Sequence, residues 1–385
     1  MLTSSQSGET EPWDSTKSAD HGQLGEAPQD RAIIPYASYT YDYIYNADGG
    51  LQSGGAGMGL LDVGFEADLE KLFGWRGASF VMTAFAGHGS DFSANYAGDF
   101  GVASNIYHGN DFNLYNIYLQ QSFGDGKSYF KIGQIAADDE FMGADAAGNL
   151  INSVFGPFNT QSGNMGAPIF PFAAPGAVIH YAPVDDWYVT VGIYAGLLEN
   201  GDPDNRGFDW RWGGGAGQTI FAETGYVYND AGGIFKLGGY YHTGEFEVFS
   251  TGEAVDGLGA IYGIVNHPII DGGEEGTSVS TFLRGSLVTE EDRAVATGYI
   301  DTGVNVTNVI KPGDALAFGV SHTLFGDDYL DATPGVTDTE TVIEATYQFP
   351  LNDHFKLQPN IQYILDPHES GRDTFLLGFR AILEF

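Results

Sequence analysis

From Ile33 to the end of the chain, apolar and polar side chains alternate with a period of two. The row of tyrosines that runs from Tyr39 to Tyr45 is interleaved with Ser38, Thr40 and Asp42. Successive side chains of a β-strand point to opposite faces, so this spacing predicts a strand with one aromatic face and one polar face.

The next segment and the last one repeat this pattern with a stronger contrast. Between Leu61 and Glu70 apolar residues alternate with Asp, Gly and Glu, and the final segment carries an apolar row that ends on Phe385. Comparable runs cover residues 77–88, 113–123, 127–136, 175–182, 187–197, 218–228, 233–246, 258–266, 277–288, 294–308, 314–325, 338–349 and 354–365. Together these segments predict an all-β protein of about 16 strands.

Strands of about ten residues with one apolar and one polar face are typical of a transmembrane antiparallel β-barrel, which leaves no strand edge in lipid. A soluble sandwich or barrel with its apolar face inward would show the same alternation. Aromatic side chains at strand ends and an aromatic residue at the end of the complete last strand favour the membrane. The residues predicted to face lipid are Tyr39, Tyr41, Phe65, Phe375, Leu377 and Phe379, and those predicted to face the lumen are Asp42, Glu66 and Arg380.

The barrel is predicted to span residues 32–385. Residues 1–31 are polar and acidic without apolar periodicity, and we expect them to form a flexible periplasmic tail. No secretory signal begins the sequence, so we expect a mature or truncated chain of an exported protein. No run of about 18 apolar residues is present, which excludes a helical membrane protein.

The longest connection runs from about Ala137 to Ala174. Between Ala146 and Val184 it contains no Asp, Glu, Lys or Arg, and it is rich in Gly, Pro, Asn and Phe. An uncharged aromatic loop in so acidic a protein is poorly suited to bulk water, so we predict that it folds into the lumen as a constriction. The alternative is an outer loop that packs on its neighbours or at a subunit contact.

Charge and composition exclude several kinds of function. The formal net charge of −36 would repel nucleic acid. The chain has no cysteine, so it can form neither a disulfide nor a thiolate metal site. The nine histidines are scattered, and no G-x-S-x-G, H-E-x-x-H or P-loop motif is present, which indicates that the protein is not an enzyme.

Acidic loops leave Ca²⁺ binding open, but none has EF-hand spacing, and a solvated loop surface is the favoured explanation. Otherwise no cofactor is expected. The acidic groups in question are Asp202, Asp204, Asn205 and Asp209, then Glu274 and Glu275, then Asp327, Asp328 and Asp331.

The candidate solute contacts are charged residues at strand positions that the alternation predicts to point into the lumen. The acids Glu66, Asp68 and Glu344 and the bases Lys131, Arg284 and Arg380 all fall on the polar face of their strands. If they oppose one another across the constriction, they create a transverse field and offer hydrogen bonds to hydroxyl groups. The alternative is that these carboxylates only hydrate the wall of a wet pore.

Several segments resemble the carbohydrate-selective porins of the OprB type. The resemblance extends from about Ile33 to Phe385 and is most specific near the C-terminus. It rests on Ile343-Glu344-Ala345-Thr346-Tyr347-Gln348, Leu357-Gln358-Pro359-Asn360-Ile361-Gln362-Tyr363, Asp366-Pro367, Gly378-Phe379-Arg380, Asp68-Leu69-Glu70-Lys71-Leu72-Phe73-Gly74-Trp75-Arg76-Gly77, Leu114-Tyr115-Asn116-Ile117-Tyr118-Leu119-Gln120-Gln121 and Lys131-Ile132-Gly133-Gln134. The chain departs from the family at Gln134, where relatives usually carry Arg, and in its few basic residues.

This resemblance implies a 16-stranded barrel whose narrowed pore passes mono- and oligosaccharides by diffusion. We add Gln134 and Asn159 to the candidate contacts, Asn159 because the loop amides could bind the wall or a passing sugar. The expected function is an outer-membrane diffusion porin for small neutral solutes; the alternatives are a general cation-preferring porin and a structural barrel that anchors the envelope.

The expected location is the bacterial outer membrane, in contact with lipid and lipopolysaccharide. Phe385 is expected to be recognised by the outer-membrane assembly machinery, and a homo-oligomer remains open.

Overall fold

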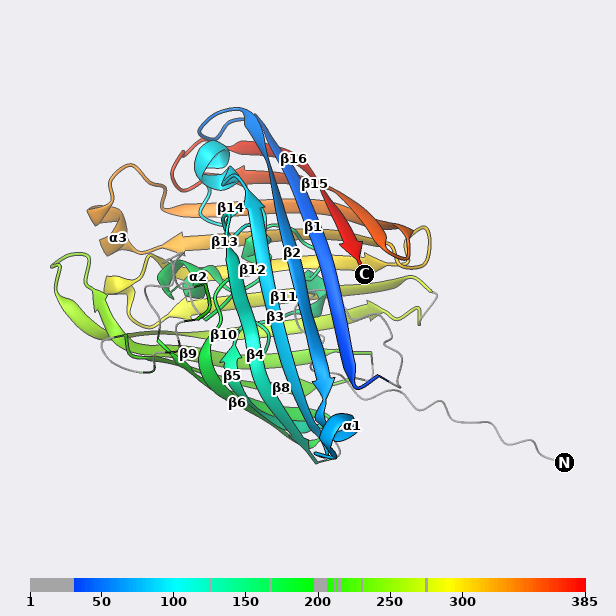
Figure 1. Cartoon of the computed structure of the whole chain (residues 1–385). Helices are drawn as coiled ribbons and strands as arrows, with labels where there is room; N and C mark the ends of the chain where they lie inside the picture. Colours follow the sequence, from blue (N-terminus) through cyan, green and yellow to red (C-terminus); the bar gives the residue numbers. More distant parts are fainter. Residues whose placement is uncertain are drawn as a thin grey trace.

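The computed structural model is a closed barrel of 16 antiparallel strands (Figure 1). It describes residues 31–124, 126–165, 168–196, 206–208, 210, 212, 216–229, 231–273 and 276–385. The predicted fold class is therefore confirmed. The tail predicted for residues 1–31 lies outside the described residues except for Arg31, so its flexibility stays a prediction.

Each predicted segment corresponds to one strand of the barrel. The strands are β1 Ile33–Asp48, β2 Gly54–Asp68, β3 Ala78–Gly89, β4 Phe112–Phe123, β5 Ser128–Ile135, β6 Ala174–Val184, β7 Trp187–Ala195, β8 Gln218–Val227, β9 Ile234–Glu247, β10 Ala254–Ile270, β11 Ser278–Val288, β12 Ala296–Thr307, β13 Ala315–Phe325, β14 Thr339–Asn352, β15 Phe355–Leu365 and β16 Thr374–Glu384. The helical segments are α1 Leu69–Phe73, η2 Ser93–Ala97, η3 Asp145–Ala147, η4 Ser153–Phe155, α2 Asn159–Met165, η5 Glu291–Arg293 and α3 Asp327–Ala332. No helix in the described part of the chain is long and apolar enough to cross a membrane.

The first and last strands close the barrel. β1 pairs with β16 so that Asp42 lies opposite Arg380 and Tyr43 lies opposite Phe379. Every other strand pairs with its neighbours in the sequence, and all these pairs are antiparallel. Each backbone ladder is therefore continued around the barrel, as a structure surrounded by lipid requires.

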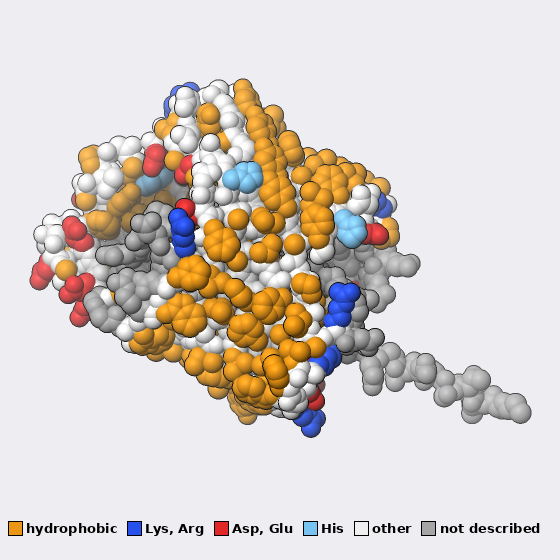
Figure 2. Space-filling model, viewed as in Figure 1, with side chains coloured by type: hydrophobic (Ala, Val, Ile, Leu, Met, Phe, Trp, Pro, Cys, Tyr) orange, Lys and Arg blue, Asp and Glu red, His pale blue; other side chains and the backbone are white. Residues whose placement is uncertain are grey.

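Side chains divide between the two faces of the wall as the alternation predicts. Asp42 and Arg380 are buried inside, where they form an ion pair, whereas Leu377 and Phe379 are exposed on the outside. A broad band of hydrophobic side chains covers the face of the barrel seen in Figure 2, and most of the acidic side chains on this face lie at the end that carries α3. This band has the character of a lipid-facing surface.

The beginning of β2 is longer than the sequence pattern suggested. Gly54–Leu60 belongs to the strand, although its glycines give no apolar row. A Cβ added to Gly57 would lie 2.1 Å from Oη of Tyr41, and one added to Gly59 would lie 2.5 Å from Oη of Tyr39. The tyrosines of β1 thus cover the glycines of β2 on the outer face, which explains why this stretch lacks side chains.

Connections at the two ends of the barrel differ in length. The end that carries α1 also carries the tight turns at residues 124–127, 185–186 and 353–354. The opposite end carries the two connections that matter most for the pore, the β3–β4 loop (residues 90–111) and the β5–β6 loop (residues 136–173). In outer-membrane barrels the short turns face the periplasm and the long loops face outside.

Candidate functional site

The β5–β6 loop folds into the barrel and packs apolar side chains against the inner wall. Phe141 stacks on Phe221 with ring centroids 5.2 Å apart, and Phe158 lies 5.2 Å from Tyr262 and 5.7 Å from Tyr299. The helical segments η3, η4 and α2 contact the strands β11, β12 and β13. The prediction that this uncharged loop lies in the lumen is confirmed, because burial of its aromatic side chains stabilises the inward position.

Carboxylates of the inner wall hold the backbone of the same loop. Glu344 accepts hydrogen bonds from the backbone N–H groups of Ile151 at 2.7 Å and Asn152 at 2.9 Å. Glu223 accepts one from the backbone N–H of Met142 at 3.2 Å. A buried backbone N–H group without an acceptor is costly, so each of these carboxyl groups fixes a point of the loop.

Arg284 holds the same loop by its backbone carbonyl groups, whereas Glu344 and Glu223 bind its N–H groups. It donates to the carbonyl oxygens of Gly156 at 2.7 Å and Met142 at 3.2 Å. Its charge is balanced by Asp301, directly opposite on β12, to which Nε donates at 3.0 Å. Because Arg284 is almost fully buried, it acts here as a bridge between wall and loop and is not exposed to the pore.

The β3–β4 loop also folds inward, which the sequence analysis did not foresee. Glu340 accepts hydrogen bonds from the backbone N–H groups of Phe100 at 2.7 Å and Gly101 at 2.8 Å. Gln362 donates to the carbonyl oxygen of Ala103 at 2.9 Å. The buried side chains of this loop include Phe92, Ala97, Ala103 and Ile106. Its apolar content was the signal that could have revealed it.

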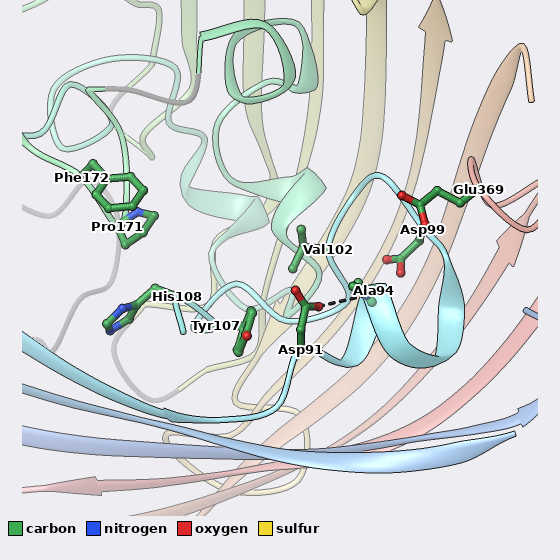
Figure 3. Close-up of a pocket in the computed structure, with 10 residues that line it drawn as sticks. Asp91, Ala94, Asp99, Val102, Tyr107, His108, Pro171, Phe172 and Glu369 are labelled. Atoms are coloured by element: carbon green, nitrogen blue, oxygen red, sulfur yellow. Dashed lines mark hydrogen bonds between the residues drawn. The ribbon is translucent and has the colours of Figure 1, made fainter. Parts of the chain in front are cut away.

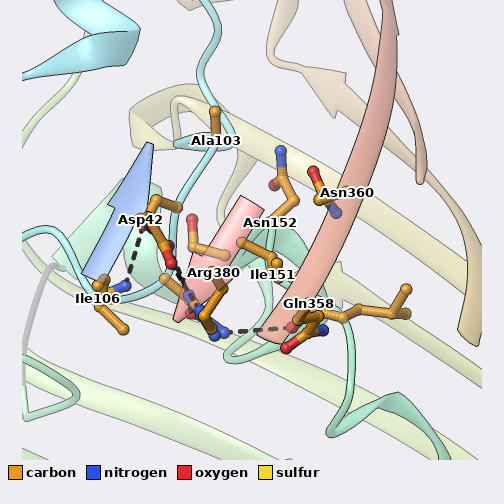
Figure 4. A network of polar contacts seen from close by, with 12 residues as sticks. Asp42, Ala103, Ile106, Ile151, Asn152, Gln358, Asn360 and Arg380 are labelled. Atoms are coloured by element: carbon orange, nitrogen blue, oxygen red, sulfur yellow. Dashed lines mark hydrogen bonds and ion pairs between the residues drawn. The ribbon is translucent and has the colours of Figure 1, made fainter. Parts of the chain in front are cut away.

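The ion pair that closes the barrel joins this loop as well. Arg380 donates to both carboxylate oxygens of Asp42 at 2.8 Å and to Oδ1 of Asn105 at 2.6 Å. Ser104 donates to Asp42 at 2.7 Å. Figure 4 shows how this network brings β1 and β16 together with both inward loops. It belongs to the structural frame of the constriction.

A second polar region lines the lumenal side of β2 to β5, which we call the β2–β5 wall. Tyr36 donates to Asp62 at 3.1 Å, and Asn116 donates to Asp139 at 2.7 Å. Lys131 pairs with Glu140, and its Nζ lies 4.8 Å from the ring centroid of Tyr118. Most of these groups belong to strands, and the two acids Asp139 and Glu140 belong to the start of the β5–β6 loop.

The structure brings together some of the candidate contacts predicted from the sequence. Arg380 lies close enough to Glu344 for an electrostatic interaction. Glu66 of β2 lies in register with Val81 of β3, and Val81 lies in register with Tyr118 of β4, the ring that also faces Lys131. Each of the three candidate bases forms its ion pair with an acid outside the candidate set, namely Glu140 for Lys131, Asp301 for Arg284 and Asp42 for Arg380.

Three further candidates lie in local structural roles. Asp68 is the N-cap of α1 and accepts hydrogen bonds from the backbone N–H groups of Glu70 and Lys71. Gln134 donates to the carbonyl oxygens of Leu114 and Tyr115 on the neighbouring strand. Asn159, at the start of α2, donates to Oγ1 of Thr323 at 2.9 Å. Parity selected Asp68, the family resemblance Gln134 and the loop amides Asn159, but none of these signals gave information about their partners.

Ca²⁺ binding receives no support from the described acidic loops. Asp327, Asp328 and Asp331 lie on α3, and no group of three or more His, Asp or Glu side chains in the described part of the chain could hold a metal ion. The other acidic groups, Asp202, Asp204, Asn205 and Asp209 with Glu274 and Glu275, lie outside the described residues.

A closed 16-stranded barrel with an apolar outer band and inward loops defines a porin-type channel of the bacterial outer membrane. The model of the family described as "Carbohydrate-selective porin, OprB family" matches residues 52–385. The chain therefore belongs to this family of sugar-selective outer-membrane porins, and the family and fold are those of channels.

Known relatives agree with this membership. The chain is 24% identical to Porin B of Pseudomonas aeruginosa over 86% of this chain and 82% of that protein. It is 20% identical to the putative porin QuiX of Acinetobacter baylyi over 92% of this chain and 88% of that protein. The high-pH structure of Pseudomonas putida OprB superposes with a TM-score of 0.82 at 20% identity and covers 92% of this chain and 94% of that one.

Proposed function

We propose that mono- and oligosaccharides cross this porin between the two inward loops and the β2–β5 wall. The observation that carries this proposal is the placement of the β5–β6 loop, whose helical segments pack on β11, β12 and β13. The lumen on that side is filled by Phe158, Tyr262 and Tyr299. Space for a solute is therefore expected on the opposite side.

In this proposal the lumenal charges have two different roles. Hydrogen bonds join Glu344, Arg284 and Arg380 to the two inward loops. Glu66 is only half-buried and forms no hydrogen bond with the residues that the structure describes. We assign Glu66 to sugar contact, because a partly exposed carboxylate near the ring of Tyr118 suits hydroxyl rims and C–H faces, whereas Lys131 and Glu140 are buried against that ring.

This division offers hydrogen-bonding groups to neutral solutes in a chain of strongly negative charge. Each basic side chain buried in the described lumen, namely Lys131, Arg284 and Arg380, is compensated by an acid. Each of these ion pairs presents a transverse dipole to which the hydroxyl groups of a neutral solute can hydrogen-bond. Other lumenal acids, among them Asp62, Glu223 and Glu340, have no basic partner among the described residues, and the cation-preferring alternative would depend on these acids.

Liposome swelling with mono-, di- and trisaccharides tests the proposal. Glu66→Gln should lower the saturable part of sugar flux roughly two- to tenfold, because one hydrogen bond contributes about 0.5–1.5 kcal/mol. Asp68→Asn is the matched control: it has the same lumen parity, but Asn is an equally good N-cap and flux should not change. Equal flux in wild type and Glu66→Gln, together with strong cation selectivity in a salt gradient, would favour the cation-preferring alternative.

The remaining expectations about partners are also proposals. Phe385 is 75% exposed at the end of β16, and its backbone N–H donates to Ala37 at 2.9 Å. An exposed terminal aromatic on a paired strand is available for recognition by the assembly machinery. Deletion of Phe385 should therefore leave unassembled chain in the periplasm, detected by loss of the heat-modifiable band; normal membrane levels would contradict this. Homo-oligomerisation and contact with lipopolysaccharide stay predictions.

A further inference from the structure

A cavity of about 350 Å³ lies at the outer end of the barrel, apart from the β2–β5 wall. The β3–β4 loop supplies most of its lining, and the β5–β6 and β15–β16 loops complete it through Pro171, Phe172 and Glu369. Figure 3 shows that the lining is divided: Asp99 and Glu369 lie together at one end, and His108, Pro171 and Phe172 lie at the other. A solute bound here would contact an acidic group and an apolar surface at once.

The acidic end contains a carboxylate without adequate partners. Asp99 is only 8% exposed, and neither of its carboxylate oxygens has a hydrogen-bond partner of ordinary geometry among the described residues. Ser93 and the backbone N–H of Asp99 itself approach the group. The neighbouring charges from Asp91 and Glu369 are of the same sign. A buried carboxylate among other acids is costly, and a bound cation would remove that cost.

The apolar end offers a surface for the rest of the ligand. His108 packs 5.9 Å from Phe170 and 6.4 Å from Phe85. Both of its ring nitrogens are buried and lack a partner among the described residues. Burial lowers the pKa of His108, so the ring is neutral at pH 7 and can donate one hydrogen bond and accept another. Together with Phe172, this ring can hold a sugar-sized body and bind its hydroxyl groups.

We propose that this cavity is a capture site for amino sugars, with the ammonium group at Asp99, Asp91 and Glu369 and the sugar ring against His108 and Phe172. The inference rests on the proposed function, since it takes a sugar-conducting pore as given. It adds a charge-selective site in front of that pore. A metal ion is a poorer occupant, because no group of three metal-binding side chains is arranged for one in the described part of the chain.

The chemistry of the cavity separates amino sugars from their neutral analogues. Glucosamine carries an ammonium group, whereas glucose has a hydroxyl and N-acetylglucosamine a neutral amide at the same carbon. A charge-assisted hydrogen bond is about twice as strong as a neutral one. We therefore expect glucosamine to bind the full-length porin in detergent micelles at least about tenfold more tightly than the two neutral sugars.

Titration calorimetry with these three sugars tests the proposal on wild type, Asp99→Asn and Asp327→Asn. Asp99→Asn should remove the preference for glucosamine, and Glu369→Gln should weaken it. Asp327→Asn is the matched control, because it removes an exposed acid of α3 on the same end of the barrel but outside the cavity. Each variant should keep its heat-modifiable mobility, which shows that the barrel is folded.

Two results would overturn the proposal: equal affinity of wild type for all three sugars, or an unchanged glucosamine preference in folded Asp99→Asn. Swelling with neutral sugars should be the same in wild type and Asp99→Asn, since the cavity lies outside the proposed contacts on the β2–β5 wall. Loss of neutral flux from Glu66→Gln alone tests the proposed function and leaves the capture site untouched, so the two failures can be told apart.

Discussion

The two inward loops solve the same packing problem with different residues. The β5–β6 loop is free of charged side chains from Ala146 onward, and it buries Val154, Phe155 and Phe158. The β3–β4 loop buries apolar side chains too, but it also carries Asp91 and Asp99 beside a cavity. The β5–β6 loop fills part of the lumen. The β3–β4 loop also fills part of the lumen, and in addition it presents acidic side chains to the cavity.

Their attachment to the wall follows one rule in both cases. A wall carboxylate accepts two adjacent backbone N–H groups of each loop: Glu344 for the β5–β6 loop and Glu340 for the β3–β4 loop. The comparison teaches that a charge on the lumenal face of a porin strand is not evidence of solute contact. Its hydrogen-bond partners decide whether it supports a loop or meets the solute.

The largest difference between the loops should appear when their arginines are removed. Arg284→Met leaves Asp301 buried without its basic partner and removes the donor to three carbonyl oxygens of the β5–β6 loop. Breaking a buried ion pair costs about 3–5 kcal/mol. The loop of this variant should therefore be cleaved in limited proteolysis, and the single-channel conductance of the variant should be higher than that of the wild type.

Arg380→Met is the matched change on the other side of the pore, where only Asn105 of the β3–β4 loop loses a contact. It should expose the β3–β4 loop to protease and leave the β5–β6 loop resistant. The same cleavage pattern in both variants would show that the loops are not held separately.

A smaller and more local effect is expected from the two glutamates. Glu344→Gln replaces one of the two oxygens that accept from the backbone N–H groups of Ile151 and Asn152 by an NH₂ group, and the lost bond and the donor placed against an N–H cost about 1–2 kcal/mol. Hydrogen exchange of these two amides should become about five- to thirtyfold faster, while Phe100 and Gly101 stay protected. Glu340→Gln should give the reverse pattern. If the amides of both loops exchanged equally fast in both variants, the two loops would not be anchored separately by Glu344 and Glu340.

The smallest effect is a dependence of loop packing on pH. Burial and the adjacent Asp139 raise the pKa of Asp138 to about 7, and burial with Asp91 and Glu369 raises the pKa of Asp99 to about 6. The packed loops bind these protons more tightly than released loops would. Packing therefore gains stability as pH falls through about 7 and about 6, until the ordinary pKa of 3.8 is reached.

Exchange rates corrected for intrinsic pH dependence should show more protection of both loops at about pH 5 than at about pH 8. Glucosamine binding should change in the opposite direction, because it needs the ionised form of Asp99, and should weaken below about pH 6. Asp138→Asn should remove the pH dependence of the β5–β6 loop alone. Protection that increases with pH would have the wrong sign for raised carboxyl pKa values.

The sequence predicted the barrel well because its signal is local. Alternation within one strand assigns Asp42 and Arg380 to the inside and Leu377 to the outside without knowledge of any partner. The prediction was incomplete where the local signal is missing, as in Gly54–Leu60, where tyrosines of the neighbouring strand replace the side chains that glycine lacks. The absence of charged residues from Ala146 onward in the β5–β6 loop was also a local signal, and it gave the correct position.

The candidate site could be predicted only in part. Parity placed Glu344 and Arg284 inside the barrel, but their partners lie in a loop far away in the sequence: Glu344 and Ile151 are separated by 193 positions. Nothing in a single strand encodes such a contact. The β3–β4 loop was not predicted to fold inward, because its apolar side chains are interspersed with Asp91, Asp99 and Asp111 and it lacks the long charge-free stretch of the β5–β6 loop.

The central claim is that the β5–β6 loop, held by wall charges, sets the width of the pore. Single-channel conductance of a variant in which Ile151–Met165 is replaced by a short Gly/Ser linker tests it most directly. The account predicts that conductance rises roughly two- to threefold and that larger oligosaccharides pass in a swelling assay, because a filled part of the lumen is opened. Unchanged conductance and an unchanged size limit in a folded, heat-modifiable barrel would contradict it.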